Sequence, residues 1–204
     1  MDLDDIIRRM RSSHGILYIL CGLPYSGKTY AARKILDAVP CVYVSVDDIL
    51  EALGYDWNAG KLPDEKGWES VMDISYRRTR EALWDSKNVL YDSTNHTKIS
   101  RDELRKVADD AGAGSRVVFV DAPAGVVRRR WEENKTSRKR FVLSEELLDM
   151  TIDALEVPGS DEDPWIVARW YDPYPGGGDR AWGGMYPMFF SAFVNGGFIV
   201  SLTQ

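Results

Sequence analysis

The chain has 204 residues, of which 44% are hydrophobic and 28% are charged. This length suits one domain or one domain with an appendage, and this composition excludes disorder as the dominant state. The 26 basic and 32 acidic side chains give a formal net charge of -6. That charge excludes a uniformly basic coat for nucleic acid, although it leaves room for a local basic patch.

The N-terminus and the cysteines predict a cytoplasmic protein. The chain begins with acidic residues and no apolar core, unlike a signal peptide. No uncharged run reaches the length of a membrane span without interruption, so we expect no membrane partner. Cys21 and Cys41 both lie in apolar runs, which is typical of buried, reduced thiols.

Short apolar runs alternate with amphipathic stretches. The apolar runs predict strands at residues 16–21, 41–46, 89–91, 116–120 and 165–170. The amphipathic stretches predict helices at residues 28–39, 49–53, 68–84, 101–111, 124–133 and 145–155. Ser100 and Ser144 are the expected N-caps of two of these helices. The alternation predicts an α/β fold with three layers, in which helices cover both faces of a largely parallel sheet.

The last part of the chain has a different composition. Three consecutive glycines at 176–178 predict a flexible break, and Asn195-Gly196 between apolar runs is typical of a β-hairpin turn. We therefore expect a domain over residues 1–171 and a glycine- and aromatic-rich tail over residues 172–204. The sequence indicates neither the purpose of this tail nor the oligomeric state.

A phosphate-binding motif follows the first predicted strand. Residues 22–29, GLPYSGKT, match G-x-x-x-x-G-K-[ST] in full and precede a predicted helix. In such loops the backbone N–H groups surround phosphate, the lysine reaches the β- and γ-phosphates, and the hydroxyl binds Mg²⁺. Tyr25 stands where small residues are more usual, and it either shields the loop or leans over a ligand. The residues expected to bind the nucleotide are Gly22, Leu23, Pro24, Tyr25, Ser26, Gly27, Lys28 and Thr29, with Thr29 also a metal ligand.

Two carboxylates end the second predicted strand. Ligands gather at the carboxyl ends of parallel strands, so Asp47 and Asp48 should lie beside the phosphate loop. A kinase needs a carboxylate that orients the acceptor hydroxyl and accepts its proton. We expect Asp47 to be this catalytic base. A helix-capping role is the alternative for both residues and is favoured for Asp48, which is also a candidate substrate contact.

The third predicted strand ends in Tyr91-Asp92-Ser93-Thr94-Asn95. Asp92 is expected to hold a magnesium-bound water. Asn95 is a candidate substrate contact, with turn formation as the alternative. His96 stands alone, without a second histidine or cysteine at ligand spacing, and is interpreted as a surface residue.

Seven arginines and lysines lie between residues 128 and 140. They predict a mobile lid at about residues 134–143, whose arginines close over the triphosphate and stabilise charge in the transition state. Arg138 is the expected catalytic arginine, and Arg140 is expected to bind the nucleotide. An ordinary solvated helix face is the alternative.

Together these motifs resemble the P-loop kinases of the polynucleotide kinase and zeta-toxin group, of which bacterial members are often called AAA-type ATP-binding proteins. The resemblance spans about residues 15–155. It implies nucleotide and metal roles for Lys28 and Thr29, a base at Asp47, and a third-strand motif at Asp92 and Asn95. The polynucleotide kinases carry an arginine three residues after the base, where this chain has Leu50.

We therefore expect an ATP- and Mg²⁺-dependent kinase that phosphorylates a hydroxyl group. The acidic chain and Leu50 favour a small-molecule acceptor, such as a nucleoside, sugar or antibiotic, over a polynucleotide 5′-hydroxyl. A zeta-type toxin kinase is a further alternative. An ATPase switch that acts on a partner is the alternative from another class. A GTPase is disfavoured because the sequence holds no Asn-Lys-x-Asp motif.

Overall fold

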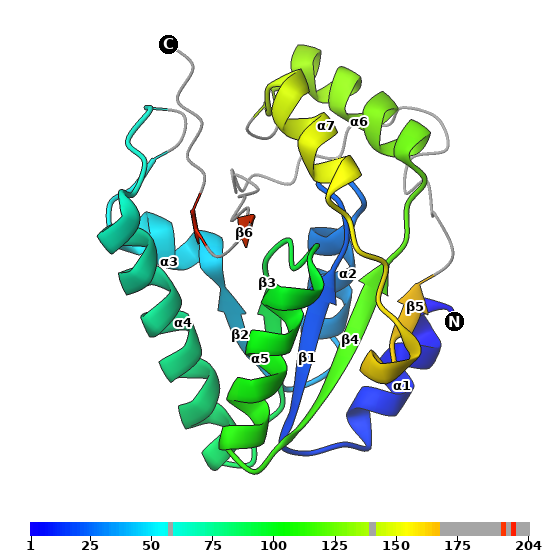
Figure 1. Cartoon of the computed structure of the whole chain (residues 1–204). Coiled ribbons are helices and arrows are strands. Elements are labelled where there is room, and N and C mark those ends of the chain that lie inside the picture. The colour runs from blue at the N-terminus through cyan, green and yellow to red at the C-terminus, as the bar shows by residue number, and fades with distance from the viewer. Residues whose placement is uncertain (57–58, 139–141, 168–192, 195–196, 199–204) are drawn as a thin grey trace.

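A five-stranded parallel sheet forms the centre of the computed structural model (Figure 1), which describes residues 1–56, 59–138, 142–167, 193–194 and 197–198. The strands lie in the order β2-β3-β1-β4-β5, and each neighbouring pair is parallel. Their bounds are Ile16–Cys21 for β1, Val42–Ser45 for β2, Val89–Asp92 for β3, Gly114–Val120 for β4 and Trp165–Val167 for β5. The predicted α/β architecture is confirmed.

Helices connect the strands and cover both faces of the sheet (Figure 1). Each face of the sheet packs against helices in a hydrophobic core. Because side chains alternate across a strand, burial of both faces explains the continuous apolar runs in the sequence. Leu17 and Ile19 face a core shared with α3, α4 and α5, whereas Tyr18 and Leu20 face a core shared with α1 and α2. The helices are α1 Leu3–Arg11, α2 Lys28–Leu36, α3 Val46–Ala52, α4 Glu65–Trp84, α5 Lys98–Asp110, α6 Ala124–Ser137 and α7 Glu145–Asp153.

A third, smaller core lies between the phosphate loop and a pair of helices that we call the arm, namely α6 and α7. Leu23 and Tyr25 from the loop pack with apolar side chains of the arm and its neighbouring segments. The indole of Trp131 on α6 donates a hydrogen bond to the carbonyl of Leu143, at 2.9 Å, which ties α6 to the chain that leads into α7. The arm therefore has its own core, and two residues of the phosphate loop belong to it.

Some helix ends differ from the prediction. Helix α5 begins one turn earlier than expected, because Thr97 rather than Ser100 is the N-cap, and its hydroxyl accepts from the Ser100 N–H at 3.3 Å. Helix α6 continues to Ser137, so the first residues of the expected lid are helical. Helix α1 was not predicted; its apolar stripe is short, but it buries Ile6, Ile7 and Met10.

Most of the tail lies outside the described residues. Strands β6, Phe193–Val194, and β7, Gly197–Phe198, pair antiparallel on either side of the Asn195-Gly196 pair. Of the predicted strand at 165–170, β5 covers the first three residues, and residues 168–170 lie outside the description. Within the described ranges, no helix has the length and apolar character needed to cross a membrane.

Candidate active site

The phosphate loop joins the end of β1 to the start of α2 and requires glycine at its first position. Gly22 has a φ of 148°, and a Cβ built there would lie 2.7 Å from the carbonyl oxygen of Val120. Gly27, with a φ of 110°, directly precedes α2. The Gly22 N–H donates to the carbonyl of Thr94 at 3.3 Å, which joins the loop to the turn after β3. The glycines thus allow the backbone to curl at the N-terminus of a nine-residue helix.

The polar side chains of the loop suit an anion with several oxygens. Lys28 is buried, and its Nζ donates to the carbonyls of Gly22 at 2.7 Å and Leu23 at 2.9 Å. Within the described part of the chain, the buried Ser26 hydroxyl has no hydrogen-bond partner. A buried hydroxyl without a partner costs about 1–3 kcal/mol, so a ligand oxygen that binds Ser26 removes a penalty. Thr29, in the first turn of α2, is partly exposed. The loop therefore fits an anion such as a chain of phosphate groups.

Asp92, the last residue of β3, is held by the neighbouring strand. The hydroxyl of Tyr43 on β2 donates to Asp92 Oδ2 at 2.7 Å. Burial raises the pKa of the Asp92 carboxyl, while the charge of Lys28 and the hydrogen bond from Tyr43 act in the opposite direction. Burial and the charge of Asp92 also raise the pKa of Tyr43, so the phenol stays protonated and donates.

The other two carboxylates lie in the first turn of α3. Ser45 is the N-cap of this helix, and its hydroxyl accepts from the Asp48 N–H at 3.1 Å. Ser45 rather than Asp47 is therefore the N-cap, whereas Asp47 and Asp48 are both acidic residues of the first turn, as the capping alternative expected for Asp48. Both residues are half-buried. The charge of Asp48 raises the pKa of Asp92, and Ser45, three residues before Asp48, pairs with Asp92 in the sheet.

The turn after β3 is buried, and its polar groups bind the protein itself. Asn95 adopts a φ of 46°, and its Nδ2 donates to the Leu20 carbonyl at 2.7 Å. This geometry favours the turn-forming alternative over the substrate contact for Asn95. The interpretation of His96 as a surface residue was wrong, because its exposed fraction is 2%. Burial, together with the charges of Lys28 and Arg101, lowers the pKa of His96 to about 4.

The arm contacts the phosphate loop through a residue that the sequence did not single out. Arg130 of α6 donates from Nη1 to the carbonyls of Tyr25 and Ser26, at 3.0 Å each. Tyr25 itself shields the loop, since it is 4% exposed and packs in the core of the arm. Arg138 is the exposed C-cap of α6, with a φ of 46°. Arg140, with part of the expected lid, lies outside the described residues.

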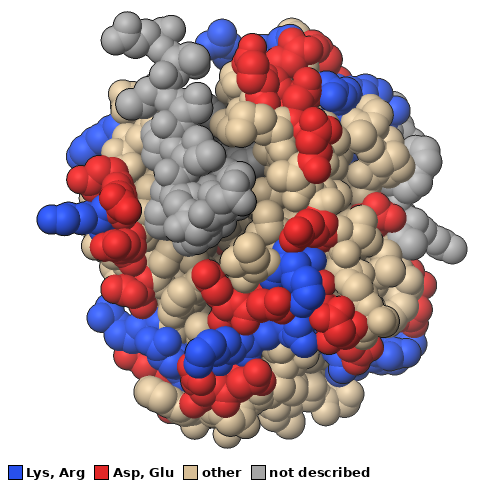
Figure 2. Space-filling view, in the orientation of Figure 1, with Lys and Arg blue, Asp and Glu red and all other residues tan. Residues whose placement is uncertain are grey.

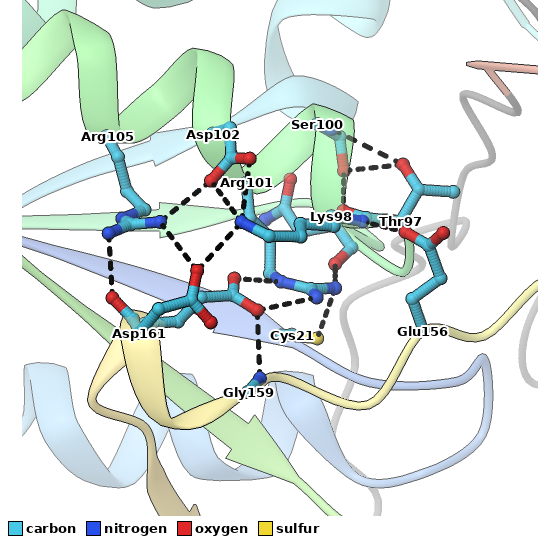
Figure 3. Close-up of polar contacts among 12 residues, drawn as sticks. Cys21, Thr97, Lys98, Ser100, Arg101, Asp102, Arg105, Glu156, Gly159 and Asp161 are labelled. Atoms are coloured by element: carbon cyan, nitrogen blue, oxygen red, sulfur yellow. Dashed lines mark hydrogen bonds and ion pairs between the residues drawn. The ribbon is translucent and has the colours of Figure 1, made fainter.

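A buried ion pair holds the turn after β3 through a contact with its backbone (Figure 3). Arg101 of α5 binds Glu162 at two points and also donates to the Asn95 carbonyl at 3.1 Å. Its Nη1 lies 3.7 Å from Cys21 Sγ at the end of β1. Around this pair, Lys98 binds Asp102 and Asp161 at the surface (Figure 3). The sequence held no signal for the Arg101–Glu162 pair, because 61 positions separate its members.

The comparisons with known proteins agree with this geometry. A family model described as AAA domain, AAA_33, matches residues 17–158. Among curated proteins, none matches the chain significantly. Two solved structures of a Pnkp1/Rnl/Hen1 RNA repair complex match at 24% and 21% identity and TM-scores of 0.52 and 0.61, covering 58% and 70% of this chain. This chain spans only 39% and 44% of the length of those two chains.

Two other solved structures match over more of their own length. Kti12 of Chaetomium thermophilum, in complex with ADP-AlF3, is 21% identical with a TM-score of 0.56, over 76% of this chain and 90% of that one. A gluconokinase from Sinorhizobium meliloti 1021 is 18% identical with a TM-score of 0.55, over 77% and 85%. At these identities the likeness is one of fold. With a complete phosphate loop between β1 and α2 and a family model that matches more than half of its residues, the chain belongs to the AAA domain family AAA_33 and has the fold of P-loop kinases.

Proposed function

We propose that this protein is an ATP-dependent kinase that transfers the γ-phosphoryl group to a hydroxyl. The observation that carries the proposal is the phosphate loop with its buried Lys28 and partnerless Ser26 hydroxyl, in the described part of the chain, together with the Asp92 carboxylate at the end of the neighbouring strand β3. Phosphoryl transfer needs little covalent chemistry from a protein. It needs a fixed triphosphate, neutralised charge and an oriented acceptor.

The residues of the loop and of β3 have separate roles in this proposal. The loop backbone and Lys28 hold the phosphates, so Lys28 exchanges its contacts with the Gly22 and Leu23 carbonyls for phosphate oxygens. Thr29 and Asp92 would hold Mg²⁺. Bound Mg²⁺ neutralises charge on the phosphate oxygens and aligns the β- and γ-phosphates. Arg138, and Arg140 in the undescribed segment, are proposed to close over the transferred group from the end of the arm.

Asp47 is the proposed catalytic base. Ser45 is the N-cap, and Asp47 lies in the first turn of α3, just beyond the carboxyl end of β2. A carboxylate there can orient an acceptor hydroxyl and accept its proton while phosphate transfers. Asp48 follows Asp47 in the same turn and is proposed to contact the acceptor.

The acceptor is proposed to be a small molecule, such as a nucleoside, sugar or antibiotic, in the cytoplasm. Helix α3 and the segment up to α4 carry more acidic than basic residues, and this excess opposes a polyanion. The acidic residues are Asp47, Asp48, Glu51, Asp56 and Asp64, against Lys61. On the face drawn in Figure 2, charges of both signs are interspersed, and no broad basic surface of the kind that binds a nucleic-acid backbone is present among the residues described.

A polynucleotide 5′-hydroxyl is the second candidate acceptor, and the cations between residues 128 and 140 are the observation in its favour. A transfer screen with labelled γ-phosphate separates the two. It covers nucleosides, sugars, antibiotics and 5′-hydroxyl oligonucleotides, and it measures acceptor phosphorylation and free phosphate release in parallel. Labelling of a small molecule supports the first candidate, and labelling of the oligonucleotide alone supports the second. Phosphate release without any labelled acceptor supports an ATPase switch.

Asp47→Asn tests the base in the same screen. We expect at least ~10²-fold slower transfer with unchanged ATP affinity, the usual scale for a positioned acid–base group. Asp37→Asn, at the exposed end of α2, is the matched control. Full transfer by Asp47→Asn would reject Asp47 and move the role to Asp48 or Asp92.

A further inference from the structure

One hydroxyl from β2 reaches the carboxylate at the end of β3. The register pairs Tyr43 with Leu90 and Ser45 with Asp92, so Tyr43 and Asp92 are diagonal neighbours on one face of the sheet. An aromatic side chain spans this diagonal. The resulting contact joins Tyr43 Oη to Asp92 Oδ2 at 2.7 Å.

This face is the one that α2 covers. Tyr43 packs against the core that contains Ala31 and Ala32 of α2. The charge of Lys28, the first residue of α2, acts on the Asp92 carboxylate. The carboxylate therefore lies on the same side of the sheet as the helix that begins with Lys28 and Thr29.

The hydrogen bond decides how the carboxylate is oriented. The carboxylate of an aspartate can rotate about its Cβ–Cγ bond. A hydrogen-bond donor on Oδ2 fixes the plane of the group and leaves Oδ1 for a further partner. Ser45, which pairs with Asp92 in the register, caps the helix that carries Asp47 and Asp48. The Tyr43 hydroxyl thus fixes the carboxylate at the end of β3, beside the strand that leads into α3.

We infer that Tyr43 is a positioning residue, which holds the Asp92 carboxylate in the orientation that the Mg²⁺–nucleotide complex requires. The inference rests on the proposed function, because it needs a metal–nucleotide complex at the loop. Groups that orient metal-binding carboxylates without touching the metal typically contribute 10–100-fold to metal affinity or activity. Tyr43 acts through Asp92 alone and has no part in holding the phosphates themselves.

The test removes one oxygen and measures metal and nucleotide separately. In Tyr43→Phe the ring stays in its apolar surroundings, and thermal unfolding verifies that the fold is intact. We expect ATP affinity measured by calorimetry in EDTA to equal that of the wild type. We expect ATP affinity with Mg²⁺ to fall at least ~10-fold, and the Mg²⁺ concentration for half-maximal transfer to rise by a similar factor. Tyr30→Phe, which removes the same oxygen from an exposed position on α2, is the matched control.

A second background shows whether Tyr43 acts through Asp92. In Asp92→Asn, adding Tyr43→Phe should cause no further loss of Mg²⁺-dependent affinity, because the carboxylate to be oriented is absent. A full additional loss would overturn the inference, as would wild-type Mg²⁺ dependence in Tyr43→Phe. The wild type is measured first. If its nucleotide binding does not respond to Mg²⁺, the proposed function fails, whereas a normal wild type with a normal Tyr43→Phe overturns the positioning role alone.

Discussion

The guanidinium of Arg101 and the carboxylate of Glu162 bind each other at two points inside the protein, Nε to Oε1 at 2.6 Å and Nη2 to Oε2 at 3.0 Å. Glu162 Oε2 also accepts from the Gly159 N–H at 3.1 Å, and Arg101 donates to the Asn95 carbonyl. The side chains are 0% and 1% exposed. The pair therefore fixes the segment that follows α7 to the turn that follows β3.

Removal of one member of this pair should destabilise the protein strongly. Arg101→Met leaves the Glu162 carboxylate buried without its partner, and such changes cost about 3–5 kcal/mol of unfolding free energy. The double variant Arg101→Met/Glu162→Leu leaves no unpaired charge and should recover most of this loss. Urea unfolding monitored by circular dichroism measures both. A single variant within about 1 kcal/mol of the wild type would contradict a role in stability for the pair.

Lys28→Ala should nearly abolish phosphoryl transfer. The variant loses the cation that compensates charge on the β- and γ-phosphates, and we expect at least ~10²-fold slower transfer and weaker ATP binding. Lys34→Ala is the matched control, since Lys34 is exposed on the same helix and lies over the ring of Tyr30. Initial rates and calorimetric affinity are the measurements. Equal turnover for Lys28→Ala and Lys34→Ala would refute the assignment of the loop.

Arg130→Ala should weaken ATP binding through the shape of the loop. Hydrogen bonds from a charged group contribute about 1.5–3 kcal/mol each, so loss of both contacts to the loop carbonyls is expected to reduce ATP affinity by at least ~10-fold. Arg129→Ala, the neighbouring exposed arginine that lies near Glu133, should leave ATP affinity within about twofold of the wild type. Calorimetric titration with ATP decides between these outcomes. Identical affinities for the two variants would show that the Arg130 contact does not shape the loop.

His96 should make the protein less stable as the pH falls below about 6.5. The pKa of His96 is lowered from 6.5 to about 4. Between these two pH values the unfolded chain therefore binds a proton that the folded chain does not. Stability is therefore full above pH 6.5 and is lost as the pH falls, by up to about 1.4 kcal/mol per pH unit. Urea unfolding across the window should show a shallower pH dependence for His96→Gln than for the wild type. His14→Gln, at an exposed position, should keep the wild-type slope, and an unchanged slope in His96→Gln would contradict the burial of the imidazole.

The strands and the phosphate loop were predicted because their signals are local. A strand covered on both faces, such as β1, reads as a continuous apolar run, and the loop motif is contiguous. The contact of Arg130 with Tyr25 joins residues 105 positions apart, and Arg130 looks like any other member of a basic run. The burial of His96 likewise depends on a distant segment, since its carbonyl accepts from the Glu156 N–H. Thr97 and Ser100 both suit a helix N-terminus, and spacing alone did not decide between them.

Because Tyr25 packs within the arm, the phosphate loop has two structural roles. Its backbone curls where phosphate is expected to bind. Its apolar side chains pack against α6 and α7, and its carbonyls accept hydrogen bonds from Arg130. Because protein interiors are close-packed, a change in the backbone of the loop is expected to shift the side chains that pack against the two helices. We therefore expect a ligand that changes the backbone between Gly22 and Gly27 to shift α6 through its contacts with Tyr25 and Ser26.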